Sequence, residues 1–173
     1  MNTKKIKIGI LGGSFDPAHK GHLAISKEAK KRFKLEKIIW AITRKNPFKA
    51  VSKTPVSKRI KDCKKLIGSN TFIKVKFYED TINSNKTIDL INYLKKNKKL
   101  EIFFLMGADN LISFHKWHKS KLITEKCNII VFDRHGYKKN SLKSKTFKKL
   151  NNKTLTFVKF KKVNISSSQL RKI

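Results

Sequence analysis

The chain has 173 residues, which suits one domain, and its 39% hydrophobic content with 12 Phe excludes a disordered chain. Its 43 Lys and Arg residues outnumber 11 Asp and Glu residues, giving a formal net charge of +32. The 2 Cys residues exclude a disulfide framework and a zinc site, and no apolar stretch approaches the length of a membrane span. We therefore expect a single domain over residues 1–173 in the cytoplasm, without a membrane partner.

Short runs rich in β-branched and aromatic residues predict strands at residues 6–11, 37–42, 72–77, 102–106, 128–132 and 155–160. Apolar residues that recur every three or four positions predict helices at residues 21–33, 57–67, 87–96 and 109–114. Strands that alternate with helices are typical of βαβ units. The pattern predicts an α/β fold of the Rossmann-like, doubly wound type, with a mostly parallel sheet and helices on both faces.

The lysines are spread along the whole chain rather than gathered in one arm. No aromatic ribonucleoprotein motif, Cys/His finger or heptad-linked basic region accompanies them. The positive charge therefore predicts weak, non-specific nucleic-acid binding at low salt, and no specific nucleic-acid partner.

Ligands of open parallel sheets bind beyond the carboxyl ends of the strands. After the first predicted strand, residues 12–22 read Gly-Gly-Ser-Phe-Asp-Pro-Ala-His-Lys-Gly-His. Gly12 and Gly13 let the backbone approach a ligand, and His19 and His22 lie on one side of the following helix's first turn. Backbone N–H groups and imidazoles at that turn favour an anion, so the motif predicts a phosphate pocket. It is neither a P-loop nor a Gly-x-Gly-x-x-Gly fingerprint, and two histidines alone do not make a zinc site.

This string resembles the signature of nucleotidyltransferases that share a His-x-Gly-His motif, and the chain is most similar to their bacterial nicotinate-nucleotide adenylyltransferases. The resemblance runs from Ile6 to Arg171. It implies that His22 stabilises charge on the transferred phosphate and that His19 orients it. It also implies contacts to ATP from Gly12, Gly13, Ser14 and Phe15, and to the nicotinate nucleotide from Asp16.

Asn46-Pro47-Phe48-Lys49, after the second strand, resembles the family's loop that delivers a lysine to phosphate. The resemblance implies a catalytic role for Lys49, with a solvated loop as the alternative. Thr87-Ile88-Asp89-Leu90 is similar to the family's Thr-x-Asp-Thr-Leu. Thr87 is therefore expected at the nicotinate end of the acceptor, or as a plain helix cap.

Gly107-Ala108-Asp109 followed by Trp117 is another family-specific feature. The resemblance implies that Trp117 stacks on the pyridine ring and that Asp109 lies at the nucleotide site. The alternatives are a core position for Trp117 and a helix cap for Asp109. His115 and His118 are expected at the surface.

Two further matches lie beyond the fifth strand. Arg134-His135-Gly136 resembles the family's Arg-Pro-Gly, which implies a phosphate contact for Arg134. The C-terminal segment resembles the family's Ile-Ser-Ser-Thr-x-Ile-Arg and implies a site for the β- and γ-phosphates made by Ser166, Ser167, Ser168 and Arg171.

The resemblance implies transfer of AMP from ATP to nicotinate mononucleotide, giving deamido-NAD and pyrophosphate. Mg²⁺ is expected to enter with ATP, held mainly by its phosphates and water. Three alternatives stay open: nicotinamide mononucleotide as acceptor, phosphopantetheine as acceptor, and a catalytically inactive basic nucleic-acid-binding domain. A homo-oligomer is also left open.

Overall fold

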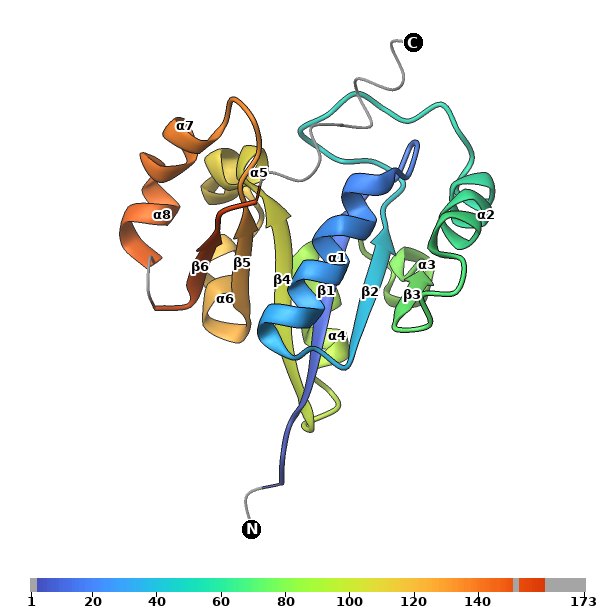
Figure 1. Cartoon of the computed structure of the whole chain (residues 1–173), viewed down its shortest axis with the longest axis horizontal. Helices are drawn as coiled ribbons and strands as arrows, with labels where there is room; N and C mark the ends of the chain where they lie inside the picture. The colour runs from blue at the N-terminus through green and yellow to red at the C-terminus, as the bar shows by residue number, and fades with distance from the viewer. Residues whose placement is uncertain (1–2, 151–152, 161–173) are drawn as a thin grey trace.

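A parallel sheet forms the centre of the computed structural model, which describes residues 3–150 and 153–160 (Figure 1). Its strands are β1 (Ile6–Gly13), β2 (Lys37–Ile42), β3 (Ile73–Lys76), β4 (Leu100–Gly107), β5 (Asn128–Phe132) and β6 (Leu155–Val158). They lie in the order β3-β2-β1-β4-β5-β6, and every pairing among the described strands is parallel. The predicted Rossmann-like α/β fold is confirmed.

Helices connect the strands and cover both faces of the sheet. They are α1 (Lys20–Phe33), α2 (Val56–Ile67), α3 (Glu79–Ile82), α4 (Thr87–Leu94), α5 (Ala108–Ser113), the 3-10 turn η1 (Phe114–Lys116), α6 (Ser120–Lys126), α7 (Lys138–Leu142) and α8 (Lys145–Leu150). α1 and α2 pack on one face, whereas α4, α5 and α6 pack on the other (Figure 1). The four predicted helices are confirmed to within two residues at each end.

Each face of the sheet has its own apolar core. Ile88 of α4 and Ile123 of α6 pack with Cys127 on one face, and Ala29 of α1 packs with Cys63 of α2 on the other. Burial raises the pKa of both thiols to about 12, so both stay protonated near neutral pH. The central strands β1 and β4 carry buried residues on both sides, which is typical of central parallel strands.

Because all the strands run the same way, their carboxyl ends meet at one edge of the sheet, uppermost in Figure 1. The loops that follow β1, β2, β4 and β5 come together at this edge. None of the helices in the described part of the chain has the length and hydrophobicity needed to span a bilayer.

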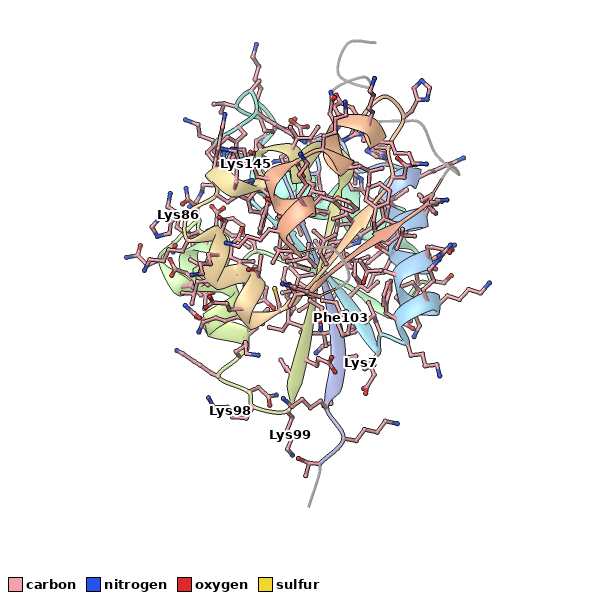
Figure 2. The ribbon with its side chains drawn as sticks, turned by 90° about the vertical axis from the view of Figure 1, so that its left-hand side faces the viewer. Lys7, Lys86, Lys98, Lys99, Phe103 and Lys145 are labelled. Atoms are coloured by element: carbon pink, nitrogen blue, oxygen red, sulfur yellow. The ribbon has the colours of Figure 1, made fainter. Side chains whose placement is uncertain are left out.

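Lysine side chains lie at both ends of the sheet (Figure 2). Lys98 and Lys99 lie where β4 begins, whereas Lys86 and Lys145 lie much nearer the opposite edge of the sheet. The distribution agrees with the spread of lysines along the sequence.

Candidate active site

The two histidines of the first motif fix each other's orientation at the start of α1. His19 is the N-cap residue, and its Nδ1 accepts the backbone N–H of Gly21 at 3.1 Å. His22 Nδ1 accepts the backbone N–H of His19 at 3.1 Å, and the ring centroids are 3.9 Å apart. Because each Nδ1 accepts a hydrogen bond, each neutral ring carries its proton on Nε2. The pair therefore offers two N–H donors to a single ligand.

Both imidazoles are neutral near pH 7. Burial, followed by the positive charge of Arg134, lowers the pKa of His19 to about 4. Burial is also the main reason that the pKa of His22 lies well below its usual range, and the neighbouring His19, Arg134 and Lys49 lower it further. The formal positive charge at this end of the site therefore comes from Lys49 and Arg134.

Phe15 supports His22 from the core. Its side chain is only 2% exposed, stacks on the Trp40 ring at 5.0 Å and contacts the His22 ring at 4.6 Å. Its φ of 49° lies in the left-handed region, which is unusual for a bulky residue. The buried phenyl ring leaves only the backbone of Phe15 for the ATP contact predicted from the sequence.

Asp109 lies between two cations that arrive from other loops. Its Oδ2 accepts a hydrogen bond from Arg134 Nη1 at 2.6 Å and lies 3.8 Å from Lys49 Nζ. The N-cap of α5 is Gly107, so the alternative that Asp109 caps this helix is wrong.

The second carboxylate oxygen of Asp109 explains why residue 107 is a glycine. Asp109 Oδ1 is buried and has no hydrogen-bond partner among the described residues. A Cβ on Gly107 would lie 2.6 Å from this oxygen, closer than real side chains approach. Gly107 thus leaves room for the carboxylate that holds the two cations.

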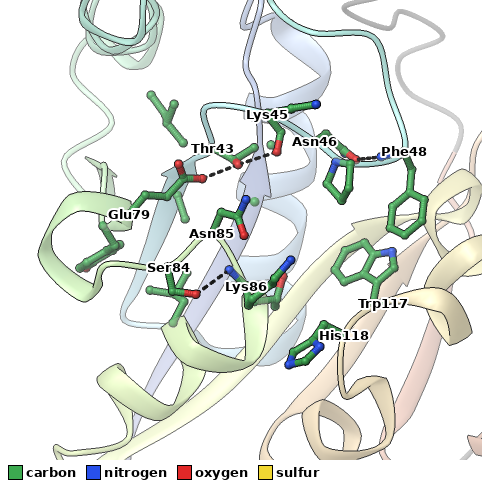
Figure 3. A pocket seen from close by; sticks show the side chains of 18 of the residues that line it. Thr43, Lys45, Asn46, Phe48, Glu79, Ser84, Asn85, Lys86, Trp117 and His118 are labelled. Carbon is green, nitrogen blue, oxygen red and sulfur yellow. Dashed lines mark hydrogen bonds between the residues drawn. The ribbon is translucent and has the colours of Figure 1, made fainter.

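A pocket of about 410 Å³ opens beside Gly12 and Gly13 (Figure 3). Its apolar lining includes Ala41, Ile42, Phe48, Ile82, Leu90 and Phe104, and its cationic lining is Lys45, Lys86 and Lys116. Thr87 and Trp117 both line it, as does the exposed His118. Thr87 is the first residue of α4, and the N-cap is Lys86, so the expectation that Thr87 caps the helix is wrong.

Trp117 belongs both to the core and to the pocket. Its ring meets Phe104 edge-on at 5.9 Å and Phe114 at 5.2 Å, and it packs against the core on the α4–α6 face. The same side chain lines the pocket opposite the loop that follows β2 (Figure 3). The two interpretations of Trp117 from the sequence are therefore not exclusive.

Known proteins similar to this chain identify its family. A family described as cytidylyltransferase-like matches residues 10–173. A probable nicotinate-nucleotide adenylyltransferase of Pelagibacter ubique (strain HTCC1062) is 68% identical over 173 residues, covering 100% of this chain and 96% of that protein. The chain belongs to the nicotinate-nucleotide adenylyltransferase family. A second relative of that name, from Clostridium botulinum (strain Eklund 17B / Type B), is 35% identical over 170 residues and covers 96% and 84% of the two chains.

Solved structures share the fold of this family member. The Plasmodium falciparum nicotinic acid mononucleotide adenylyltransferase complexed with NaAD superposes with a TM-score of 0.78 and 22% identity, covering 96% of this chain and 82% of that chain. The crystal structure of a protein from Vibrio parahaemolyticus, named a putative nicotinate-nucleotide adenylyltransferase, gives a TM-score of 0.63 and 19% identity, with coverages of 96% and 84%.

Arg59 is a residue of this family member that the sequence analysis did not single out. It lies on α2, is 3% exposed, and donates to the carbonyls of Ser14 at 2.7 Å, Thr43 at 2.8 Å and Thr54 at 2.9 Å. One guanidinium therefore ties the loop after β1 to the loop after β2. The available signal was an arginine four residues before Cys63, on the otherwise apolar face of the helix.

The remaining predicted site residues are not among those that line the pocket, or they lie outside the described residues. Asp16 is buried and accepts a hydrogen bond from Ser52 Oγ. The C-terminal residues expected at the β- and γ-phosphates, Ser166, Ser167, Ser168 and Arg171, lie outside the described residues.

Proposed function

We propose that this chain transfers the adenylyl group of ATP to nicotinate mononucleotide, giving deamido-NAD and pyrophosphate. The observation that carries the proposal is the pair of mutually fixed histidines beside a pocket lined by Trp117. The family to which the chain belongs supports the same reaction. We place this reaction in the cytoplasm, within one domain.

The reaction is a direct displacement at the α-phosphorus of ATP. A 5′-phosphate oxygen of the acceptor forms the new P–O bond, while the bond from the α-phosphorus to the bridging oxygen breaks and pyrophosphate leaves. The protein needs no nucleophile of its own, so its contribution is positioning and charge stabilisation. His22 Nε2–H donates to the α-phosphate oxygens as their charge grows, and His19 Nε2–H orients the same group.

The cations around Asp109 neutralise the phosphates. In the free protein this carboxylate binds Arg134 and holds Lys49 nearby. Phosphate oxygens compete for the same cations with more charge, so both side chains turn to the substrate when it binds. The backbone at Gly12, Gly13 and Ser14 offers close contact, and Ser166, Ser167, Ser168 and Arg171 complete the β- and γ-phosphate site.

Mg²⁺ enters this scheme with ATP. In the described residues, no three His, Cys, Asp or Glu side chains lie close enough to hold a metal ion by themselves. An ion held by the nucleotide's phosphates and water fits this sparse donor set. When bound, it would neutralise part of the charge on the phosphates and the leaving pyrophosphate.

The pocket supports a flat, anionic acceptor. Trp117 offers a ring face, and Lys45, Lys86 and Lys116 place positive charge around it. Thr87, at the start of α4, lines the same space, where the nicotinate carboxylate is expected. Phosphopantetheine has no ring to place on Trp117, which disfavours that acceptor.

The test is pyrophosphate release from ATP and Mg²⁺ with nicotinate mononucleotide, nicotinamide mononucleotide or phosphopantetheine offered separately. We expect strong preference for the nicotinate nucleotide. Preference for another acceptor would overturn the assignment of the pocket, and silence with all three would favour the nucleic-acid-binding alternative.

His22→Ala tests the catalytic assignment in the same assay. The substitution removes the donor to the α-phosphate, so kcat/KM should fall more than about tenfold, equivalent to about 1.4 kcal/mol of transition-state stabilisation. His115→Ala, at an exposed histidine outside the pocket lining, is the matched control. Retention of more than about a tenth of the wild-type kcat/KM by His22→Ala would refute the role assigned to this ring.

A further inference from the structure

Phe48 exposes a large apolar surface at the mouth of the pocket. Its side chain is 47% exposed, and of the exposed large apolar residues in the described part of the chain, Phe48, Val51 and Tyr137, it alone lines the pocket. Exposed phenyl carbon is unfavourable in water, so a ligand that covers the ring gains free energy from its burial. The exposed ring of Phe48 is therefore available for contact with a ligand in the pocket.

The loop that carries Phe48 is attached at both ends to neighbouring elements. At its start, Thr43 Oγ1 donates to Glu79 Oε1 of α3 at 2.5 Å. Near its end, Arg59 of α2 donates to the carbonyl of Thr54 at 2.9 Å. These anchors fix where the loop leaves and rejoins the fold, with Phe48 between them.

A turn within the loop sends two successive side chains to different parts of the site. Asn46 Oδ1 accepts the backbone N–H of Phe48 at 2.9 Å, and the Asn46 carbonyl accepts the N–H of Lys49 at 3.2 Å. Lys49 Nζ lies 3.8 Å from Asp109 Oδ2, whereas Phe48 lines the pocket. One turn thus places Lys49 beside Asp109 and Phe48 in the pocket.

Phe48 and Trp117 both line the pocket and are drawn close to each other in Figure 3, but the two rings are held differently. Trp117 is packed against Phe104 and Phe114. Phe48 contacts no other aromatic ring within the described residues. The pocket therefore has one aromatic wall packed into the core and a second whose ring is open to a ligand.

We propose that Phe48 is a specificity-determining residue that covers the second face of the acceptor's pyridine ring, so that the ring lies between Phe48 and Trp117. The inference rests on the proposed function, because it takes nicotinate mononucleotide as the acceptor. The N-ribosylated pyridine ring is cationic, and a cation is stabilised by aromatic faces more than by aliphatic side chains. An acceptor without an aromatic ring gains nothing specific from Phe48.

Steady-state pyrophosphate release with varied nicotinate mononucleotide tests this role. Phe48→Ala should raise the KM for the acceptor about tenfold, since stacking on one aromatic side chain contributes on that order. The kcat and the KM for ATP should stay within about twofold, because the role proposed for the ring is against the pyridine and not against the phosphates or adenine. Phe48→Tyr should restore the wild-type KM, whereas Phe48→Leu, which keeps apolar bulk without a ring, should leave it raised at least about threefold.

Val51→Ala is the matched control, since Val51 is 61% exposed on the same loop and is not among the described residues that line the pocket. An unchanged acceptor KM in Phe48→Ala, or full restoration by Phe48→Leu, would overturn the proposal while leaving the proposed function intact. Absence of turnover with nicotinate mononucleotide in the unmodified protein would instead remove the proposed function itself. Unchanged thermal unfolding of the Phe48 variants separates a local effect from misfolding.

Discussion

At the scale of single residues, the histidine pair shows how the first turn of a helix can determine which imidazole nitrogen donates a hydrogen bond. His19 and His22 each receive a backbone N–H on Nδ1, so the local fold decides which ring nitrogen carries the proton. Burial then keeps both rings uncharged at neutral pH. In the proposed reaction, two neutral donors would bind phosphate without the strong charge that would hold the product as tightly as the transition state.

The lowered pKa of His19 predicts a specific pH dependence of stability. An unfolded histidine binds a proton near pH 6.5, whereas folded His19 does so only near about 4. As pH falls through this window the unfolded state takes up more protons, so the folded state loses stability. His19→Asn keeps a capping acceptor but cannot titrate, so its unfolding free energy should fall less steeply between pH 6.5 and 4.

Urea unfolding at several pH values measures this difference. His115→Asn, at an exposed histidine, serves as the matched control for the loss of one imidazole. Parallel pH profiles for the wild type and His19→Asn would show that His19 is not held neutral by the fold.

At the scale of elements, α2 does more than cover the sheet. Arg59 on its buried face donates to carbonyls in the loops after β1 and β2, which bear the first motif and Lys49. Carbonyl groups in such turns have no partner in the sheet, and burial without one costs about 1–3 kcal/mol each. The helix thus fixes the positions of these two loops relative to each other.

Arg59→Ala should lower the free energy of unfolding by about 3 kcal/mol, because it leaves several buried carbonyls unpaired at once. Lys61→Ala, at an exposed position on the same helix, should change it by less than about 0.5 kcal/mol. Urea denaturation of both variants measures the two effects. Equal stabilities for the two variants would show that the carbonyls find water or other donors.

The sequence predicts elements well where local pattern decides them. The strands at 37–42 and 128–132 are predicted at their observed bounds, since both are short apolar runs between polar segments. The helices α3, α6, α7 and α8 are not predicted; none is longer than 7 residues, and so short a helix shows its period only weakly. Length alone does not decide this, because α5 has 6 residues and is predicted.

Within the candidate site, too, local motifs are predictable from the sequence and long-range contacts are not. The positions of His19 and Gly12 follow from a contiguous motif after a strand, and the sequence predicts them. The contacts of Arg59 and the packing of Phe15 against Trp40 join residues far apart in the chain. No local pattern encodes such contacts, so they require the fold.

At the scale of the whole molecule, the charge of +32 acts on both substrates at a distance. ATP and nicotinate mononucleotide are anions, so a positive surface raises their rate of encounter. Raising the salt from about 0.05 M to about 0.5 M should lower kcat/KM about two- to threefold and leave kcat unchanged.

Binding of labelled DNA, followed by fluorescence anisotropy, should be lost by about 0.15 M salt. Tight binding that survives this salt would favour a nucleic-acid partner.

The two buried cysteines make the chain its own reporter of local opening. Cys63 and Cys127 lie in separate cores on opposite faces of the sheet, and neither thiol is ionised near neutral pH. An alkylating reagent can react only when the covering helices detach. The alkylation rate of each sulfur therefore reports how often the helices on that face of the sheet open. Mass spectrometry of each labelled peptide, with and without nucleotide, would tell which layer of helices the substrates tighten.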